Sequence, residues 1–201
     1  MCYDFAMKRS PLRVPDINTF EPNSVERRII DSADQLGLDP EHSVLVGSAA
    51  LVLYGVQLPQ LDPLSPNKNV VRPSDVDFSV DASHFIELYD NGHTPGGAPV
   101  EFKADNANKR FSILTAGARP KSQALPADLI TRYSADYGSV RRFDRNFQKH
   151  YRKNSTVIPG TNGLRVATPE YLKQTLKTQS IDPKYLADLQ AFEAHETRSQ
   201  N

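Results

Sequence analysis

Two aspartates that lie two positions apart are the residues best suited to carry chemistry. Asp75 and Asp77 occur in the segment Arg72-Pro-Ser-Asp-Val-Asp-Phe-Ser-Val80, in which acidic and apolar residues alternate. Because successive side chains of a β-strand point to opposite faces, both carboxylates are expected on one face of a strand. Two like charges at this spacing repel each other, and a divalent cation between them would remove the repulsion. The spacing therefore predicts a metal site, and the simpler alternative is a solvated sheet edge.

A Gly-Ser turn upstream is the second candidate for chemistry. The apolar segment 43–46 predicts a buried strand, Gly47 and Ser48 follow at once, and a short helix is expected over 48–54. Backbone N–H groups and a hydroxyl at the start of a helix can bind phosphate, and glycine lets the backbone approach a ligand closely. Gly47 and Ser48 are therefore candidate phosphate-binding residues, with an ordinary strand-to-helix turn as the alternative. Arg72 could contact phosphate or simply neutralise the aspartate that follows it.

Helices and strands alternate around these residues. Apolar residues at helical spacing predict a helix over 25–36 that is capped by Asn23, and Asp81 is expected to cap a helix over 82–89. The other expected elements are a hairpin of 100–104 and 109–115 around a turn at 105–108, a helix over 139–154, and two helices that follow Thr168 and Asp182. This order of elements predicts an α/β or α+β protein with a mixed sheet.

The expected organisation has three parts. They are an irregular N-terminal arm over 1–22, a core over 23–138, and a mainly helical part over 139–201 that packs on the core. Within the core, the segment 120–138 shows no clear pattern. The Pro-rich segment 56–73 is long enough to form a lid or to contact a substrate, although a plain surface loop is the commoner case.

Composition limits the function classes. Lys plus Arg and Asp plus Glu number 24 each, so no overall field would attract nucleic acid or an anionic membrane, and such binding must be local. Cys2 is the only cysteine, which excludes a disulfide within the chain. The first residues include no apolar signal region, and no apolar stretch approaches the roughly 20 residues that span a bilayer. We therefore expect a cytoplasmic protein without a membrane role.

Three stretches resemble the nucleotidyltransferase superfamily, which includes polymerase beta, aminoglycoside nucleotidyltransferases and the toxins of abortive-infection AbiE type. They are Val46-Gly47-Ser48 with the following Ala49-Ala-Leu-Val-Leu-Tyr-Gly55, Arg72-Pro-Ser-Asp-Val-Asp-Phe78, and Gly163-Leu-Arg-Val-Ala-Thr-Pro-Glu-Tyr-Leu172 with Pro183-Lys-Tyr-Leu-Ala-Asp-Leu189. They are similar to the Gly-Ser turn, the metal-binding Asp-x-Asp strand and the C-terminal helices of that superfamily. The resemblance implies a nucleotidyltransferase-like mixed sheet flanked by helices.

The chain departs from the superfamily at the third carboxylate. Superfamily enzymes carry this acid on a later strand, and the best match, Phe111-Ser112-Ile-Leu-Thr115, has Ser112 at that place. With a hairpin turn at 105–108, Glu101 would lie opposite Ser112, and cross-strand partners share a sheet face. We therefore expect either that Glu101 supplies the third carboxylate or that this acid has been lost.

The implied activity is transfer of an NMP from an NTP to a hydroxyl of RNA or tRNA, of a protein or of a small molecule. Mg²⁺ or Mn²⁺ would be held by Asp75 and Asp77, and Glu101 would assist the attacking hydroxyl. The first alternative is a degenerate protein that binds a nucleotide or a partner without catalysis. The second is an RNA-binding module that uses the basic helix expected over 139–154, although its aromatic stripe is better explained as core.

Overall fold

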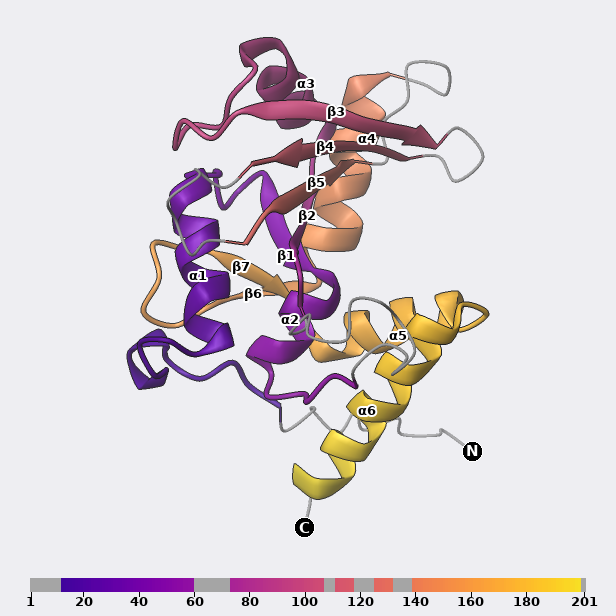
Figure 1. Cartoon of the computed structure of the whole chain (residues 1–201). Helices are drawn as coiled ribbons and strands as arrows, with labels where there is room; N and C mark the ends of the chain where they lie inside the picture. Colours follow the sequence, from indigo (N-terminus) through magenta and orange to yellow (C-terminus); the bar gives the residue numbers. More distant parts are fainter. Residues whose placement is uncertain (1–11, 60–72, 107–110, 118–124, 132–138, 200–201) are drawn as a thin grey trace, which may run out of the picture.

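The computed structural model describes residues 12–59, 73–106, 111–117, 125–131 and 139–199 (Figure 1). The helices are α1 (Val25–Leu36), α2 (Gly47–Leu53), α3 (Ala82–Asn91), α4 (Val140–Phe147), α5 (Pro169–Gln179) and α6 (Pro183–Ser199), with the 3-10 turn η1 (Ile17–Thr19) and the π-helical turn η3 (Gln148–Arg152). The strands are β1 (Ser43–Val46), β2 (Val76–Val80), β3 (Val100–Asn106), β4 (Phe111–Ala116), β5 (Ala127–Thr131), β6 (Ser155–Val157) and β7 (Arg165–Ala167).

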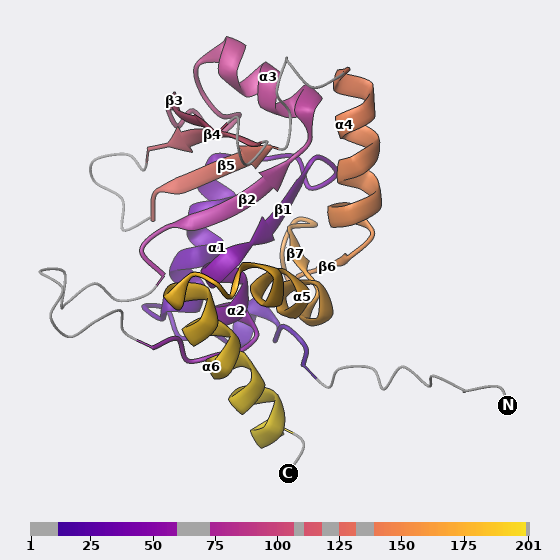
Figure 2. The same cartoon turned by 90° about the vertical axis from the view of Figure 1, so that its right-hand side faces the viewer.

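The strands form one mixed sheet, which confirms the predicted α+β class. Its seven strands follow the order β3-β4-β5-β2-β1-β7-β6. The pairs β2 with β5 and β1 with β7 are parallel, and the other neighbours are antiparallel. In Figure 2, α1 lies behind the sheet, α4 stands along one side, and α5 and α6 lie at the lower end next to α2. No helix among the described segments has the length and apolar character needed to cross a bilayer.

The buried face of the sheet carries a row of apolar side chains. Leu45 pairs with Phe78, Phe78 pairs with Leu129, and Leu129 pairs with Leu114, and all four are fully buried. Cross-strand partners share a face, so these residues form one continuous apolar surface. Ile29 of α1 is also fully buried, and it belongs to the same cluster of packed side chains. Burial of this row holds the central strands in register.

Local signals set the helix ends largely as predicted. The N-cap of α1 is Ser24 rather than Asn23, because its side chain accepts a hydrogen bond from the N–H of Arg27. Asp81 caps α3 by accepting from the N–H of His84. Gly92 ends that helix in the left-handed conformation, which glycine adopts without strain.

The N-terminal arm and the C-terminal part are both more integrated than expected. Residues 1–11 lie outside the described residues, but Leu12, Val14 and Ile17 are buried in the core. In the C-terminal part, β7 pairs with β1 in the middle of the sheet. The expected boundary at 138/139 therefore does not divide the protein into two structural parts, because the residues on both sides of it contribute strands to one sheet.

The predicted hairpin register is wrong. Glu101 pairs with Thr115 and not with Ser112. The strand β3 continues to Asn106 and β4 begins at Phe111, so the connection is shifted by two residues from the predicted turn at 105–108 to residues 107–110, which lie outside the described part of the chain. An irregularity between Phe102 and Ala104 adds a further residue to β3. A β-bulge of this kind shifts every pairing beyond it by one position.

The Asp81 cap generates a pH-dependent contribution to stability. Its buried carboxylate contacts His42 Nδ1 at 2.5 Å, and this hydrogen bond is the main reason that the pKa of His42 is raised above 6.5. Protonated His42 is therefore favoured in the folded state. This contribution is complete below the unfolded pKa of His42 and is lost as pH rises through the raised folded value.

We predict that the stability difference between the wild type and His42→Gln is largest near pH 6 and shrinks above neutral pH. Urea unfolding monitored by circular dichroism at several pH values measures it. His93→Gln, which removes an exposed histidine, is the control. A stability difference that grows with rising pH would contradict the assigned role of the His42–Asp81 pair.

Candidate metal centre

Three carboxylates meet near the first residues of β2 and β5, two neighbouring strands in the interior of the sheet. Oxygen atoms of Asp75, Asp77 and Asp128 all lie within 4.8 Å of one another. The first two residues are the pair predicted from the sequence, and the structure places them on the same side of their strand as expected. The third residue, Asp128, lies in the segment whose pattern was not clear. Hard oxygen ligands in this number suit Mg²⁺ or Mn²⁺, which bind one or more carboxylates and complete their coordination with phosphate or water.

Strand pairing explains why these acids converge. Asp75 directly precedes β2, Asp77 lies within it, and the parallel pairing of β2 with β5 places Asp77 opposite Asp128. On the other side of β5, Asp128 pairs with Thr115 of β4. Because paired residues share a sheet face, Asp128 projects on the same side as Asp77. The geometry of the site therefore follows from the register of two parallel strands.

Glu101 is not the third carboxylate. It lies on β3, two strands away from β5, and its side chain is exposed. The described residues that could jointly hold an ion are the three aspartates alone. The prediction that Glu101 joins Asp75 and Asp77 is wrong because β4 lies between β3 and β5, so Glu101 is separated from Asp128 by a whole strand. Arg72, the other predicted contact, lies outside the described residues.

Burial, together with the crowding of negative charge, raises the pKa of Asp77 to about 7 from an ordinary value of 3.8. Burial is the largest cause, and the neighbouring carboxylates of Asp75 and Asp128 add to it. Lys184 and Lys103 act in the opposite direction. Without a cation, this site therefore stores electrostatic repulsion, which a bound divalent ion would relieve.

Lys103 brings a positive charge to Asp128. Its Nζ lies 2.5 Å from Asp128 Oδ2, and this hydrogen bond is the main reason that the pKa of Lys103 is raised. Lys103 occupies the irregular position between Phe102 and Ala104, and bulges commonly redirect a side chain. About half of the Lys103 side chain remains exposed. The ammonium group of Lys103 can therefore move away from Asp128 when a metal ion enters the site.

Gly47 lies directly against the acids. Its φ is 68°, in the left-handed region that glycine adopts without strain. A Cβ atom at this position would lie 2.4 Å from Asp77 Oδ2, well inside contact distance. The sequence predicted that Gly47 is needed for close approach to a phosphate. The structure gives a different reason, which is that the Asp77 carboxylate occupies the space of the missing side chain.

The first turns of α6 close another side of the site. The hydroxyl of Ser48 lies 3.5 Å from Oδ2 of Asp188, a carboxylate that is almost fully buried. Tyr185 is half-buried, and its pKa is raised by burial first and by the charge of Asp77 second. Asp188 and Tyr185 belong to the C-terminal stretch that carried the resemblance to the superfamily. That stretch therefore packs beside the Gly-Ser turn rather than forming a separate unit.

Asp128 could have been found from one signal in the sequence. In the run Leu125-Pro-Ala-Asp-Leu-Ile-Thr131, a proline precedes a short segment whose Leu, Ile and Thr residues are typical of a strand, and Asp128 lies within it. Lys103 had no comparable signal, because its position depends on the bulge.

No family model matches the chain, and no curated protein matches it. Among solved structures, it is similar to the crystal structure of JHP933 from Helicobacter pylori, with a TM-score of 0.43 and 14% sequence identity, covering 88% of this chain and 70% of that chain. A likeness at this level carries no argument about activity.

We predict that Asp77→Asn stabilises the metal-free protein above neutral pH. Asp77 is deprotonated in the unfolded chain above about pH 4, whereas in the folded state it holds its proton to about pH 7. The wild type therefore loses stability as pH rises across this window, and the variant does not. We expect an advantage on the order of 4 kcal/mol at pH 8 that vanishes below pH 4. Chemical unfolding in EDTA measures it, with Asp90→Asn as an exposed control.

We also predict that Gly47→Ala lowers the free energy of unfolding by more than the backbone strain of replacing a left-handed glycine. Gly92 has a similar φ of 69°, but nothing lies within 4 Å of a Cβ built there, so Gly92→Ala reports the strain by itself. That strain is on the order of 1 kcal/mol. Gly47→Ala must additionally displace the Asp77 carboxylate and should weaken binding of Mn²⁺ in calorimetry. Equal unfolding free energies and unchanged Mn²⁺ binding in both variants would show that Gly47 does not position Asp77.

Proposed function

We propose that this protein is a divalent-metal-dependent nucleotidyltransferase, which transfers an NMP from an NTP to a hydroxyl group. The observation that carries the proposal is the convergence of Asp75, Asp77 and Asp128 on one sheet face. The absence of an acid at Ser112 favoured a degenerate protein. Because Asp128 supplies a third carboxylate from another strand, the serine at position 112 no longer favours a degenerate protein.

Each acid has a role in the proposed reaction. Asp75 and Asp77 would hold Mg²⁺ or Mn²⁺, and the ion would supply positive charge at the triphosphate as the pyrophosphate leaves. Asp128 accepts the proton of the attacking hydroxyl. The hydroxyl oxygen forms a bond to the α-phosphorus, the bond from that phosphorus to the pyrophosphate oxygen breaks, and pyrophosphate departs. No atom of the chain becomes covalently attached to the substrate.

The neighbouring residues support this division of roles. Lys103 neutralises Asp128 in the structure described here, and its exposed stem lets it move toward a phosphate when the ion enters. Gly47 and Ser48 lie beside Asp77 and Asp188, so the predicted phosphate contacts from this turn remain part of the proposal.

A nucleotide-binding protein without catalysis is the second candidate. The observation that favours it is the ion pair between Lys103 and Asp128, because a carboxylate that is paired with an ammonium group is a weaker proton acceptor. The two candidates differ in turnover and not in nucleotide binding.

We predict that Asp128→Asn lowers transfer of label from an α-labelled NTP by at least about 100-fold, the usual contribution of a general base. Binding of Mn²⁺ and NTP, measured by calorimetry, should change much less because Asp75 and Asp77 remain. Glu101→Gln, on the same sheet, should leave both quantities unchanged. Wild-type protein that binds NTP but shows no transfer would favour the second candidate, and full activity of Asp128→Asn would rule out its role as base.

A further inference from the structure

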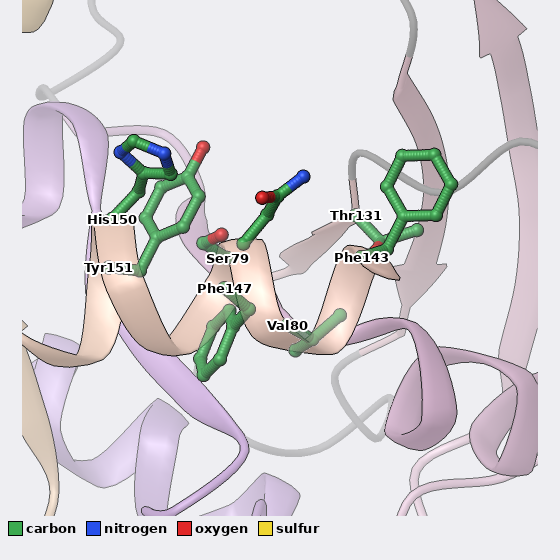
Figure 3. Close-up of a pocket in the computed structure, with 8 residues that line it drawn as sticks. Ser79, Val80, Thr131, Phe143, Phe147, His150 and Tyr151 are labelled. Atoms are coloured by element: carbon green, nitrogen blue, oxygen red, sulfur yellow. The ribbon is translucent and has the colours of Figure 1, made fainter. Parts of the chain in front are cut away.

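A small pocket lies at the C-terminal ends of β2 and β5, against α4 and the π-helical turn η3 (Figure 3). Ser79 and Val80 are the last residues of β2, and Thr131 is the last residue of β5. The two strands are parallel, so these ends lie side by side. The three aspartates of the candidate metal centre lie near the opposite, N-terminal ends of the same strands. The pocket is therefore a separate place in the fold.

The C-terminal end of parallel strands is a favourable position for a ligand, because the crevice outside this end is a common binding place in α/β sheets. The helical wall of this crevice is formed by Phe143, Asn146, Phe147, His150 and Tyr151. The last two belong to η3, and π-helical turns are frequent at functional sites. The aromatic stripe expected to be core is thus only partly core. Phe147 is buried, while Phe143 and Tyr151 are half-buried and stand at opposite ends of the pocket in Figure 3.

Polar groups of the sheet and of the helix meet in this pocket. Ser79 and Thr131 are only 5% and 2% exposed, so two hydroxyl groups are held at its buried side. Asn146 and His150 line it from the exposed side. Hydroxyl, amide and imidazole groups can all donate hydrogen bonds. Among the described residues that line the pocket none is an acid, so no carboxylate of the lining competes for these donors. A ligand that accepts hydrogen bonds is therefore favoured.

Positive charge flanks the pocket along the helix. Arg142 lies four residues before Asn146 and Lys149 lies three residues after it, and residues at these separations are neighbours on a helix surface. Both cations are exposed, and neither forms an ion pair within the described segments. The acid of α4, Asp144, accepts hydrogen bonds from the N–H and the hydroxyl of Ser83. The local potential therefore favours an anion, although the whole chain has no net charge.

The volume of the pocket, about 80 Å³, limits the size of that anion. A cavity of about 150 Å³ holds benzene, so this pocket accommodates about four non-hydrogen atoms in proportion. A six-membered ring is too large, whereas a carboxylate with a short alkyl group fits. None of the lining side chains carries a permanent charge, so the burial of a doubly charged phosphate would be poorly compensated. A singly charged carboxylate matches both the size and the charge.

We propose that this pocket binds a free short-chain carboxylate of the size of acetate or propionate. The carboxylate oxygens accept hydrogen bonds from Ser79 and Asn146, and the alkyl group packs against Phe143. Arg142 and Lys149 compensate the charge from the exposed side. No bond is made or broken, and binding requires neither a metal ion nor a nucleotide. The site is therefore independent of the proposed transfer reaction.

Titration of the ¹⁵N-labelled full chain with sodium propionate in EDTA, followed by NMR, tests the proposal without any substitution. Sodium chloride is reduced as propionate is added, because salt screens exposed charges. We expect saturable shifts of the backbone amides of Ser79, Thr131 and Asn146. Propionamide has the same shape without the charge and should bind about tenfold more weakly, since each exposed cation within roughly 6 Å contributes about threefold in a water-like dielectric. Equal binding of the two compounds, or no saturable shifts, would overturn the proposal.

Three variants locate the binding site. Asn146→Leu removes the amide at an exposed position and should lower the propionate affinity about tenfold, the usual effect of losing a hydrogen bond to a charged group. Arg142→Gln/Lys149→Gln should lower it about tenfold and leave the propionamide affinity unchanged. Arg141→Gln/Arg145→Gln removes the same charge from another face of α4 and is the matched control. Circular dichroism verifies that each variant is folded. The same propionate affinity in all three variants would contradict the assigned site.

Two further ligands test the class and the source of the carboxylate. Inorganic phosphate tests the charge, and glutamate blocked at both ends presents the same group on a peptide backbone. Both should bind more weakly than propionate, because the lining has no permanent charge and the pocket has no room for a backbone. Tighter binding of phosphate would overturn the assignment to a carboxylate. Tighter binding of the blocked glutamate would overturn the assignment to a free acid and indicate a protein partner instead.

The variant Asp75→Asn/Asp77→Asn separates this inference from the proposed function. It should bind propionate as the wild type does while it loses binding of Mn²⁺. Loss of propionate binding in this variant would place the ligand at the acidic end of the strands and overturn the inference. Wild-type protein that binds propionate at the pocket but transfers no nucleotide would overturn the proposed function alone.

Discussion

The parallel pairing of β2 with β5 is the constraint on which the candidate site depends. It sets Asp77 opposite Asp128, so two carboxylates that repel each other are held together by backbone hydrogen bonds and by the apolar row beneath them. Phe78 and Leu129 follow the two acids in the same register and are fully buried on the other face. Repulsion above the sheet is thus opposed by hydrophobic burial below it, and such a conflict is typical of functional sites.

Local signals made the helices and the central acids predictable from the sequence. Asp81 and Gly92 mark the two ends of α3, and the alternation around Asp75 and Asp77 indicates that these two acids share one face of the strand. These features depend on neighbours within a few residues. The cap, the turn and the period of a strand are all encoded at that distance.

Longer-range features could not be predicted in the same way. The register of β3 and β4 depends on one additional residue at Lys103, which no turn or periodicity signal marks. The strands β6 and β7 have three residues each, too few to establish a period. Asp128 was missed because its five-residue strand lies in a segment without a helical or hairpin pattern around it. The third acid of the site therefore depends on strand pairings between residues far apart in the sequence.

The position of β7 has a consequence for folding during synthesis. β1 carries Val44 and Leu45, both fully buried, and its second partner is formed by residues 165–167, far downstream of β1 in the sequence. Until that segment leaves the ribosome, β1 presents an apolar strand edge of the kind that promotes association between chains. The same strand leads directly into Gly47. Completion of the sheet around β1, and with it the support for the acidic site, must therefore wait until residues 165–167 have been made.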